Sequence, residues 1–373
     1  MRILVICSES PFNIHGGRGV HVQKLYDKLE GKIDIHFLHY DPTWGDSWYP
    51  HSCFREEFCI EDNMPGFANL AINTRRILKH AVKLCQKYKF DIIHSHEWDT
   101  VDVAKDLSEI TSIPWAHTFH LFQSQLIERE RRSPTKEELY SMCLEEVALS
   151  HADKVVVVSN SMKEFCREER VEVVYNGVDI EDFDKPRSGY SDKPIVLYCG
   201  RLAEQKGYKE FLKAVTLSND YYWILLGDFD YLSEEEAEAI PERIALKEFA
   251  FDNINNFYWA KRDVLNKANW FSLCDYVVMP SICEPFGIVA LEAFASKKPL
   301  IVNRVDGLLE FCNDSNSYQA KTAEEIIEVL NSKPTKHGYE TAKNFTWEKC
   351  VNKHLEIYKE LYDSPQINRE RML

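Results

Sequence analysis

Glu284 and Glu292 stand eight positions apart, and the stretch between them, Pro285–Leu291, is apolar throughout. A carboxylate within an apolar helix is costly unless it has a partner. Glu292 could accept the hydroxyl protons of a ribose. Glu284, placed where a loop meets the expected helix, could position a polyhydroxylated ligand beside the first helix amides. The alternative for Glu292 is a salt-bridged surface residue, which its apolar neighbours disfavour.

Arg201 and Lys206 lie within a loop that begins at Gly200 and ends at Gly207. The loop follows an apolar strand and precedes a helix. A fork-shaped guanidinium together with a point-like ammonium suits a diphosphate. The alternative is a solvated turn with two surface cations.

Gly16, Gly17 and Gly19 form another glycine cluster, again between a strand and a helix. Glycines let backbone amides approach a phosphate closely, and a helix N-terminus adds partial positive charge. The spacing is not G-x-G-x-x-G and no convincing acidic ribose ligand follows the next strand, so a dinucleotide-dependent oxidoreductase is disfavoured. An ordinary tight turn is the alternative.

Four histidines, His94, His96, His117 and His120, lie near the ends of two expected strands. A metal site is a tempting hypothesis, but successive side chains along a strand point to opposite faces. We therefore expect one or two of these histidines to be structural and keep only His120 as a site residue. The eleven cysteines are scattered without a C-x-x-C pair, which favours reduced thiols over a zinc site.

The elements around these residues alternate between short apolar strands and amphipathic helices, the pattern of parallel βαβ units. The expected strands are Ile3–Cys7, Ile33–His39, Ile92–Ser95, Trp115–His120, Val155–Ser159, Val171–Tyr175, Ile195–Tyr198, Tyr222–Leu226, Ile254–Trp259, Tyr276–Met279 and Leu300–Val302. The expected helices are Val20–Leu29, Asn73–Lys89, Thr100–Ile110, Lys136–His151, Gly207–Thr216, Asp263–Ser272, Phe286–Ala295, Thr322–Asn331 and Trp347–Tyr362.

Both halves of the chain open with an apolar strand, a glycine-containing loop and a helix. We therefore predict an α/β fold of two doubly wound parallel-sheet domains facing each other across a cleft. A segment rich in Asp, Pro, Gly and Ser, at 179–192, predicts the linker between a first domain at 1–185 and a second at 190–346. The remaining helical segment, 347–373, is expected to cross back and brace the first domain.

Composition narrows the class of protein. The 373 residues, 45% hydrophobic and 28% charged, are typical of a globular protein of two domains. With 45 Lys and Arg against 60 Asp and Glu, the net charge of −15 disfavours nucleic-acid binding. No apolar run approaches the roughly 18 residues of a membrane-spanning helix, and Ile3–Cys7 is too short for a signal peptide, so we expect a cytoplasmic location.

The segment 74–89 carries six Lys and Arg side chains and no acidic one, with apolar residues at helical spacing. An amphipathic surface helix with a solvated basic face is the favoured interpretation. The functional alternative is a peripheral contact with an anionic membrane or a lipid-linked acceptor.

In the frame E-P-F-G-I-V-A-L-E, Glu284 and Glu292 resemble the E-x7-E signature of retaining GT-B glycosyltransferases, especially glycosyltransferase family 4 and its glycogen-synthase-like relatives. Other segments match in order and spacing over nearly the whole chain. They are Gly16-Gly17, Asp91–Trp98, Thr118–His120, Tyr175–Asp179, Gly200–Gly207 and Phe345–Glu348.

The resemblance implies a GT-B fold of two Rossmann-like domains, with a nucleotide sugar bound mainly by the C-terminal domain and the acceptor by the N-terminal domain. Arg201 and Lys206 would hold the donor diphosphate, Glu292 the ribose and Glu284 the transferred sugar. Further contacts from the two domains would come from the amides of Phe286, Gly287 and Ile288, from the Gly16-Gly17 loop over the diphosphate, and from His120 at the donor sugar.

We therefore expect retaining transfer of a hexosyl group from a UDP- or GDP-sugar to a glycan or lipid-linked acceptor. No D-x-D constellation stands near the site, so neither a metal nor another cofactor is expected. A sugar phosphorylase, an epimerase and a non-catalytic nucleotide-sugar sensor are the alternatives. Relatives commonly carry glycine where this chain has Phe229 and Asp306, and Asp306 would add negative charge near the diphosphate.

Overall fold

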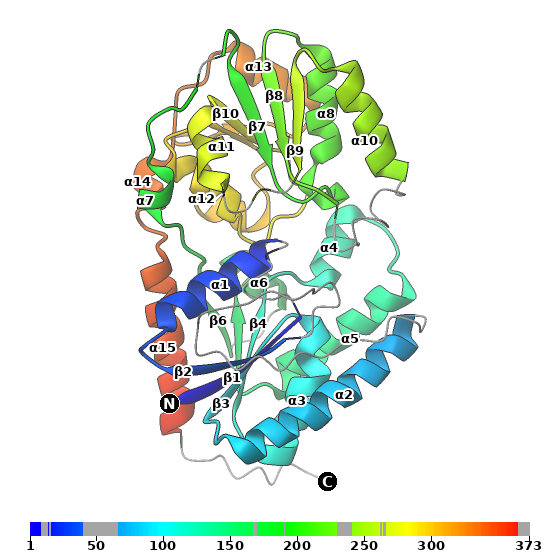
Figure 1. The fold of residues 1–373 in the computed structure, drawn as a ribbon, viewed down its shortest axis with the longest axis vertical. Helices are drawn as coiled ribbons and strands as arrows, with labels where there is room; N and C mark the ends of the chain where they lie inside the picture. Colours follow the sequence, from blue (N-terminus) through cyan, green and yellow to red (C-terminus); the bar gives the residue numbers. More distant parts are fainter. Residues whose placement is uncertain are drawn as a thin grey trace. The chain divides into compact units, whose positions relative to one another are not determined.

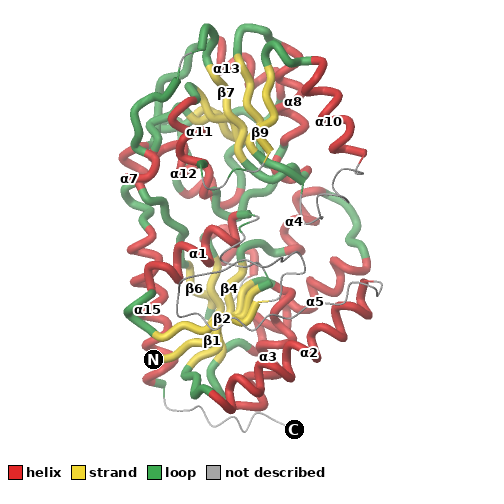
Figure 2. The backbone as a smooth tube through the Cα atoms, in the orientation of Figure 1, coloured by secondary structure: helices red, strands yellow, loops and turns green. Residues whose placement is uncertain are grey.

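The computed structural model describes residues 1–8, 14, 16–39, 66–166, 170–189, 191–229, 241–261, 263 and 266–364. The chain divides into two compact units, Met1–Tyr175 with Glu348–Leu373, and Asn176–Trp347. Each unit is built on a six-stranded parallel sheet with helices around it, as Figure 1 and Figure 2 show. The predicted α/β class with two parallel sheets is confirmed.

The N-terminal unit has the strand order β2-β1-β3-β4-β5-β6, and all neighbours are parallel. Its strands are β1 (Arg2–Cys7), β2 (Asp34–His39), β3 (Ile92–His96), β4 (Trp115–Phe119), β5 (Lys154–Val157) and β6 (Val171–Val173). Its helices are α1 (Gly17–Leu29), α2 (Gly66–Lys87), η1 (Trp98–Thr100), α3 (Val101–Thr111), α4 (Gln123–Glu130), α5 (Lys136–His151), α6 (Asn160–Cys166) and α15 (Trp347–Asp363).

The C-terminal unit has the strand order β12-β11-β10-β7-β8-β9, again with parallel pairs. Its strands are β7 (Ile195–Cys199), β8 (Tyr222–Leu226), β9 (Phe257–Lys261), β10 (Tyr276–Met279), β11 (Leu300–Val302) and β12 (Tyr318–Gln319). Its helices are α7 (Ile180–Phe183), η2 (Glu204–Lys206), α8 (Tyr208–Leu217), α10 (Pro241–Asp252), α11 (Lys267–Leu273), α12 (Ile288–Ala295), η3 (Asp306–Glu310), α13 (Ala323–Asn331) and α14 (Tyr339–Ala342).

Each sheet has a topological switch point, where successive strands of the chain are added on opposite sides of one strand. In the N-terminal unit β1 lies between β2 and β3, and in the C-terminal unit β7 lies between β8 and β10. The loops that leave the carboxyl ends of two such neighbouring strands diverge to opposite faces and leave a crevice, where ligands bind in open α/β sheets. The loops that start at Gly200 and at Pro280 follow β7 and β10 and so belong to this point.

Most predicted elements are present, and the errors lie at their ends. The expected strand Ile254–Trp259 begins only at Phe257, because α10 continues to Asp252 and residues 253–256 form turns. The helix expected from Phe286 begins at Ile288, since Gly287 has a φ of +103° and is its N-cap. The helices α4, α6, α7, α10 and α14 and the strand β12 have no counterpart among the predicted elements.

The last helix packs on the first elements of the chain, and Figure 1 shows α15 in red beside the blue segment. The Tyr358 hydroxyl lies 2.6 Å from His94 Nδ1 of β3. Lys28 of α1 forms an ion pair with Glu348 at 3.0 Å. The N-terminal unit therefore combines the first six strands with the last described helix of the chain. Among the described residues, no helix is both long and apolar enough to cross a bilayer.

Candidate active site

The two loops at the switch point of the C-terminal sheet are joined by backbone hydrogen bonds. The amides of Ile282 and Cys283 donate to the carbonyl of Gln205, at 2.7 and 3.3 Å. From β7, the Tyr198 hydroxyl donates to the carbonyl of Arg201 at 2.9 Å. The diphosphate loop predicted from the sequence is thus held by both β7 and the loop after β10.

Gly207 is the closest contact between these loops. Its φ is +70°, a conformation that glycine adopts without steric cost, and a Cβ at this position would lie 2.1 Å from the carbonyl oxygen of Pro280. That oxygen belongs to the backbone, so a side chain could not be accommodated by a rotamer change. The glycine is required by both conformation and space.

Lys206 and Glu284, two of the predicted site residues, are brought together. Lys206 Nζ lies 2.8 Å from Glu284 Oε2, with side chains 21% and 9% exposed. Ser281 Oγ is 3.3 Å from the same oxygen. The ion pair is largely shielded from water, where charge-assisted hydrogen bonds are strong. Arg201 lies in the same loop, with a half-buried side chain.

Asp306 explains one departure from the family pattern. Its φ is +47°, which aspartate tolerates better than most residues, and this matches the glycine that relatives commonly carry. Its Oδ2 accepts the backbone N–H of Glu284 at 3.0 Å, and the residue is buried. The carboxylate thus orders the Glu284 backbone. At the other departure, the Phe229 ring packs edge-on against Tyr208.

Glu292 has the partner that its apolar surroundings demand. Lys267 Nζ, from the first residue of α11, lies 2.5 Å from Glu292 Oε2 on α12. Both side chains are largely buried, at 16% and 5% exposure. No sequence pattern marks Lys267, because only the packing of α11 against α12 makes the two residues neighbours. The amides of Phe286, Gly287 and Ile288 lie at the start of α12, its positive end.

In the N-terminal unit, His120 follows β4 and ends a chain of buried polar groups. His120 Nε2 and His96 Nδ1 share a hydrogen bond at 3.2 Å, and His96 Nε2 lies 2.8 Å from the Tyr26 hydroxyl. The same hydroxyl is 2.8 Å from His94 Nδ1. Burial first, and neighbouring histidines second, hold the pKa of His96 and of His120 well below the usual value. Both imidazoles are therefore neutral at pH 7.

The histidines divide between two faces of the sheet. His117 contacts Ser95 on one face, at 2.7 Å, while His94 and His96 share the other because they are two residues apart. His21 of α1, which sequence analysis missed, joins the second group, with its ring 4.5 Å from that of His120. Ring nitrogens of His21, His96 and His120 all lie within 4.8 Å of one another.

Glu97 supports the backbone beside His120. Its Oε1 accepts the amides of His120 and Leu121 at 2.7 and 3.0 Å. The Glu97 backbone has φ 69° and ψ 160°, a region that residues with a Cβ rarely adopt. Burial, opposed by the nearby Arg18, raises the pKa of the Glu97 carboxyl to about 8. Backbone strain and a shifted pKa thus coincide next to a predicted site residue.

Gly16 and Gly17 open α1, as the glycine pattern predicts. Gly16 is the N-cap, and its carbonyl accepts the N–H of Val20 at 3.1 Å. Gly17 is the first helical residue and is exposed. Arg18 Nη1 contacts Asp99 Oδ2 at 3.5 Å, which joins the start of α1 to the segment after β3.

The predicted site residues therefore form two groups, one in each unit. Arg201, Lys206, Glu284, Phe286, Gly287, Ile288 and Glu292 belong to the C-terminal unit; Gly16, Gly17 and His120 belong to the N-terminal unit. Within the C-terminal unit, Lys206 and Glu284 are in direct contact through a hydrogen bond.

The basic segment 74–89 lies mainly on α2 and is amphipathic, as predicted. Ile77, Ala81 and Leu84 are buried, while Lys79 and Lys83 are exposed. The basic side chains therefore lie on the exposed face of the helix, as the charge pattern predicts. Contact of this face with a membrane stays a prediction.

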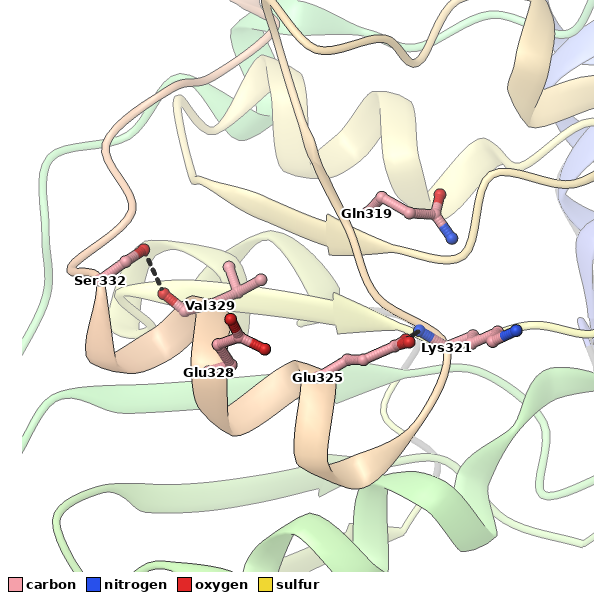
Figure 3. A pocket seen from close by; sticks show the side chains of 6 residues that line it. All are labelled: Gln319, Lys321, Glu325, Glu328, Val329 and Ser332. Atoms are coloured by element: carbon pink, nitrogen blue, oxygen red, sulfur yellow. Dashed lines mark hydrogen bonds between the residues drawn. The ribbon is translucent and has the colours of Figure 1, made fainter.

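A pocket of about 510 Å³ lies along α13 and the end of β12 and contains none of the predicted site residues. Figure 3 shows Glu325 reaching back towards Lys321, whose backbone N–H donates to its carboxylate at 2.8 Å. Gln319 and Glu328 line the same pocket.

Comparison with known proteins shows the family and the fold. The model of Glycosyltransferase Family 4 matches residues 15–182, and that of Glycosyl transferases group 1 matches residues 179–346. An uncharacterised glycosyltransferase of Methanocaldococcus jannaschii is 28% identical, over 93% of this chain and 95% of its own.

Solved structures of the same fold cover the whole chain. Sucrose-phosphate synthase from Thermosynechococcus elongatus has a TM-score of 0.81 at 19% identity, covering 98% of this chain and 100% of that one. HepE of Anabaena, in complex with UDP and glucose, has a TM-score of 0.74 at 19% identity, covering 96% of this chain and 99% of that one. The two family matches meet at the boundary between the two units, and the chain belongs to glycosyltransferase family 4, with the GT-B fold.

Proposed function

We propose that the chain is a retaining hexosyltransferase that uses a nucleotide sugar, a UDP- or GDP-sugar first, and needs no metal. Its acceptor would be a glycan or a lipid-linked sugar. The observation that carries this proposal is the Lys206–Glu284 pair, at 2.8 Å, where the loops after β7 and β10 meet. Lys206 could bind a phosphate, and Glu284, which lies beside it, could accept hydrogen bonds from sugar hydroxyls.

The chemical problem in such a transfer is the charge that develops on the leaving nucleoside diphosphate. Arg201 and Lys206 supply two cations in one loop, and the positive end of α12 adds partial charge without a metal. Glu284 would hold hydroxyls of the transferred sugar, and Glu292 the ribose. In the retaining mechanism of the family, the leaving phosphate oxygen takes the acceptor proton, so no protein general base is assigned.

His120 and the Gly16-Gly17 loop of the N-terminal unit would contact the donor sugar and the diphosphate. A neutral His120 is suited to a hydrogen bond with a sugar hydroxyl, since its lowered pKa leaves one ring nitrogen as donor and the other as acceptor. Glu97 would hold this residue in place through its two backbone contacts.

The test is a thermal-shift panel of UDP, GDP and ADP with their glucose and mannose conjugates, with and without Mg²⁺. HepE is known in complex with UDP, and Arabidopsis Starch Synthase IV with ADP, so both bases belong in the panel. A ligand at 100 times its Kd stabilises the folded state by about 2.7 kcal/mol, a rise of several degrees in Tm.

We expect one base to raise the Tm independently of Mg²⁺, and Glu292→Ala and Arg201→Ala to lose the shift. Exposed Lys213→Ala, on α8 of the same unit, is the control and should keep it. The absence of a shift with every nucleotide would contradict the transferase proposal. The anomeric configuration of the product, followed by NMR, separates retention from inversion.

The lipid-linked acceptor and the basic face of α2 are tested together by flotation with vesicles. Binding to anionic vesicles at low salt, lost when Lys79 and Lys83 are replaced by Glu, would support a peripheral membrane contact. If the chain does not float with anionic vesicles at low salt, the face is a solvated surface only.

A further inference from the structure

Lys267 has no part in the roles assigned so far, although it forms a buried ion pair with Glu292, the residue assigned to the ribose. Lys267 begins α11, and its ammonium lies 2.5 Å from Glu292 Oε2. The Lys267 side chain is 16% exposed and that of Glu292 only 5%. Two charges removed from water in this way need good geometry to be tolerated at all. The pair is therefore a buried ion pair and not a contact between surface side chains.

Its surroundings place it at the carboxyl end of β7. Burial raises the pKa of the Cys199 thiol to about 12, with the Lys267 charge opposing and the Glu292 charge adding to the shift. Cys199 is the last residue of β7 and immediately precedes the Gly200–Gly207 loop. Lys267 and Glu292 therefore lie near the start of the Gly200–Gly207 loop, which would hold the diphosphate.

Lys267 is ionised at neutral pH. Burial alone would lower the pKa of Lys267, but Glu292 and Cys199 outweigh it, so that the pKa is raised above its usual value. The Lys267 ammonium, close to Oε2, would fix the orientation of the Glu292 carboxylate. It leaves other acceptor positions for a ligand, because the two carboxylate oxygens together offer about four.

We propose that Lys267 is a positioning residue that orients Glu292 towards the vicinal hydroxyls of the ribose, and that the pair selects ribonucleotides over deoxyribonucleotides. The inference rests on the proposed function, since it assumes that a nucleoside diphosphate binds here. Lys267 acts through Glu292 and need not touch the ligand. A carboxylate accepts hydrogen bonds from two vicinal hydroxyls only in a suitable rotamer. Removing the cation that holds this rotamer should therefore weaken binding of the ribose diol specifically.

The experiment measures Kd by calorimetry for UDP, GDP and ADP and for their 2′-deoxy forms. Wild type, Lys267→Met, Lys267→Arg and Lys213→Met are compared, the last as a control in which the exposed Lys213–Glu324 pair is removed. Wild type should prefer the ribonucleotide at least tenfold, which corresponds to about 1.4 kcal/mol. In Lys267→Met this preference should fall towards one, because only ribonucleotide binding weakens. Lys267→Arg should restore part of it, and Lys213→Met should leave it unchanged.

A structural role of Lys267 alone would weaken both nucleotides equally, and that result would overturn the inference. So would tighter ribonucleotide binding in Lys267→Met, which would mean that the ammonium occupies the ribose position.

Thermal melts check that Lys267→Met folds. If it does not, the double variant Lys267→Met/Glu292→Gln, without an unpaired buried charge, should fold and show no ribose preference. If wild type binds none of the nucleotides, the proposed function fails as well, whereas wild-type binding with an unchanged preference defeats only this inference.

Discussion

At the scale of single residues, the environment of a carboxyl group decides what it can do. Glu284, Glu292 and Asp306 are all buried, but each has its own partner: an ammonium, another ammonium and a backbone amide. Glu97 is held by two amides, and its backbone adopts a conformation that costs on the order of 1–3 kcal/mol. Strain of this size persists only where the surroundings maintain it, beside His120 in this chain.

Glu97→Gln isolates the ionisation of this group, because the amide oxygen can still accept the two N–H groups. The pKa of Glu97 is about 8 in the folded chain and near 4.5 when unfolded. Since the folded value is raised, the stabilisation present below pH 4.5 is lost as the pH rises to about 8. Relative to wild type, the variant should gain at least about 1 kcal/mol of stability between pH 5 and pH 8. Urea unfolding at both pH values measures the change, and an equal difference at the two would contradict it.

At the scale of elements, the site depends on contacts between loops that follow neighbouring strands. Gly207 allows η2 and the loop after β10 to touch, and Gln205 accepts two amides from that loop. The histidine group likewise combines α1, β3 and the residue after β4. Neither arrangement depends on one element alone, so a change in any of the loops should disturb ligand binding before it disturbs the sheets.

Gly207→Ala should lose nucleotide binding, because its Cβ would lie 2.1 Å from a backbone oxygen in addition to requiring a φ of +70°. Gly31→Ala is the matched control, since Gly31 has a φ of +76° but no atom within 4 Å of a Cβ. The control should cost about 1–2 kcal/mol of stability and keep its affinity. Urea unfolding and calorimetry with the selected nucleotide report the two quantities. Equal losses of affinity in both variants would show that the loop contact is unimportant.

EDTA treatment should change neither the Tm nor the transfer rate. His96 and His120 share a hydrogen bond at 3.2 Å, and among the residues that the structure describes no carboxylate joins the group that they form with His21. Three neutral imidazoles suit Zn²⁺, so this group is the place to look if the prediction fails. A Tm that falls with EDTA and recovers with Zn²⁺ would establish a metal site there, and His21→Ala should then abolish the recovery.

At the scale of the whole molecule, we expect the two units to differ in their sensitivity to acid. Burial lowers the pKa of six histidines, His36, His94, His96, His117, His120 and His354. All six lie in the N-terminal unit. In the unfolded chain each would titrate near 6.5, so below that pH the unfolded state binds protons that the folded state excludes.

The N-terminal unit should therefore unfold first when the pH falls from 7.5 to 5. Each histidine removes up to about 1.4 kcal/mol per pH unit below 6.5. Glu97 and Glu145, whose pKa values are raised to about 8 and about 7, act in the opposite direction but are fewer. Hydrogen exchange followed by mass spectrometry should show peptides of β3, β4 and α15 losing protection before those of β7 and β10. Earlier loss in the C-terminal unit would contradict the argument.

Much of this protein is determined by its sequence alone, because its signals are local. The alternation of apolar strands with amphipathic helices predicts the α/β class, and Lys136–His151, Tyr222–Leu226 and Tyr276–Met279 have the bounds that their patterns indicate. The glycines and cations of the loop after β7, and the carboxylates around Pro285–Leu291, could be proposed as site residues because ligand chemistry restricts residue types at short spacing.

Only the tertiary structure decided which side chains contact the predicted site residues. Lys267 beside Glu292, Asp306 beneath the Glu284 amide, and His21 beside His120 join residues far apart in the chain. Their contacts arise from the packing of α11 on α12, the return of η3 to the loop after β10, and the placement of α1 over β3. No short sequence pattern carries such contacts, because they depend on which helices cover which face of a sheet. That choice is made by the burial of the whole apolar surface at once.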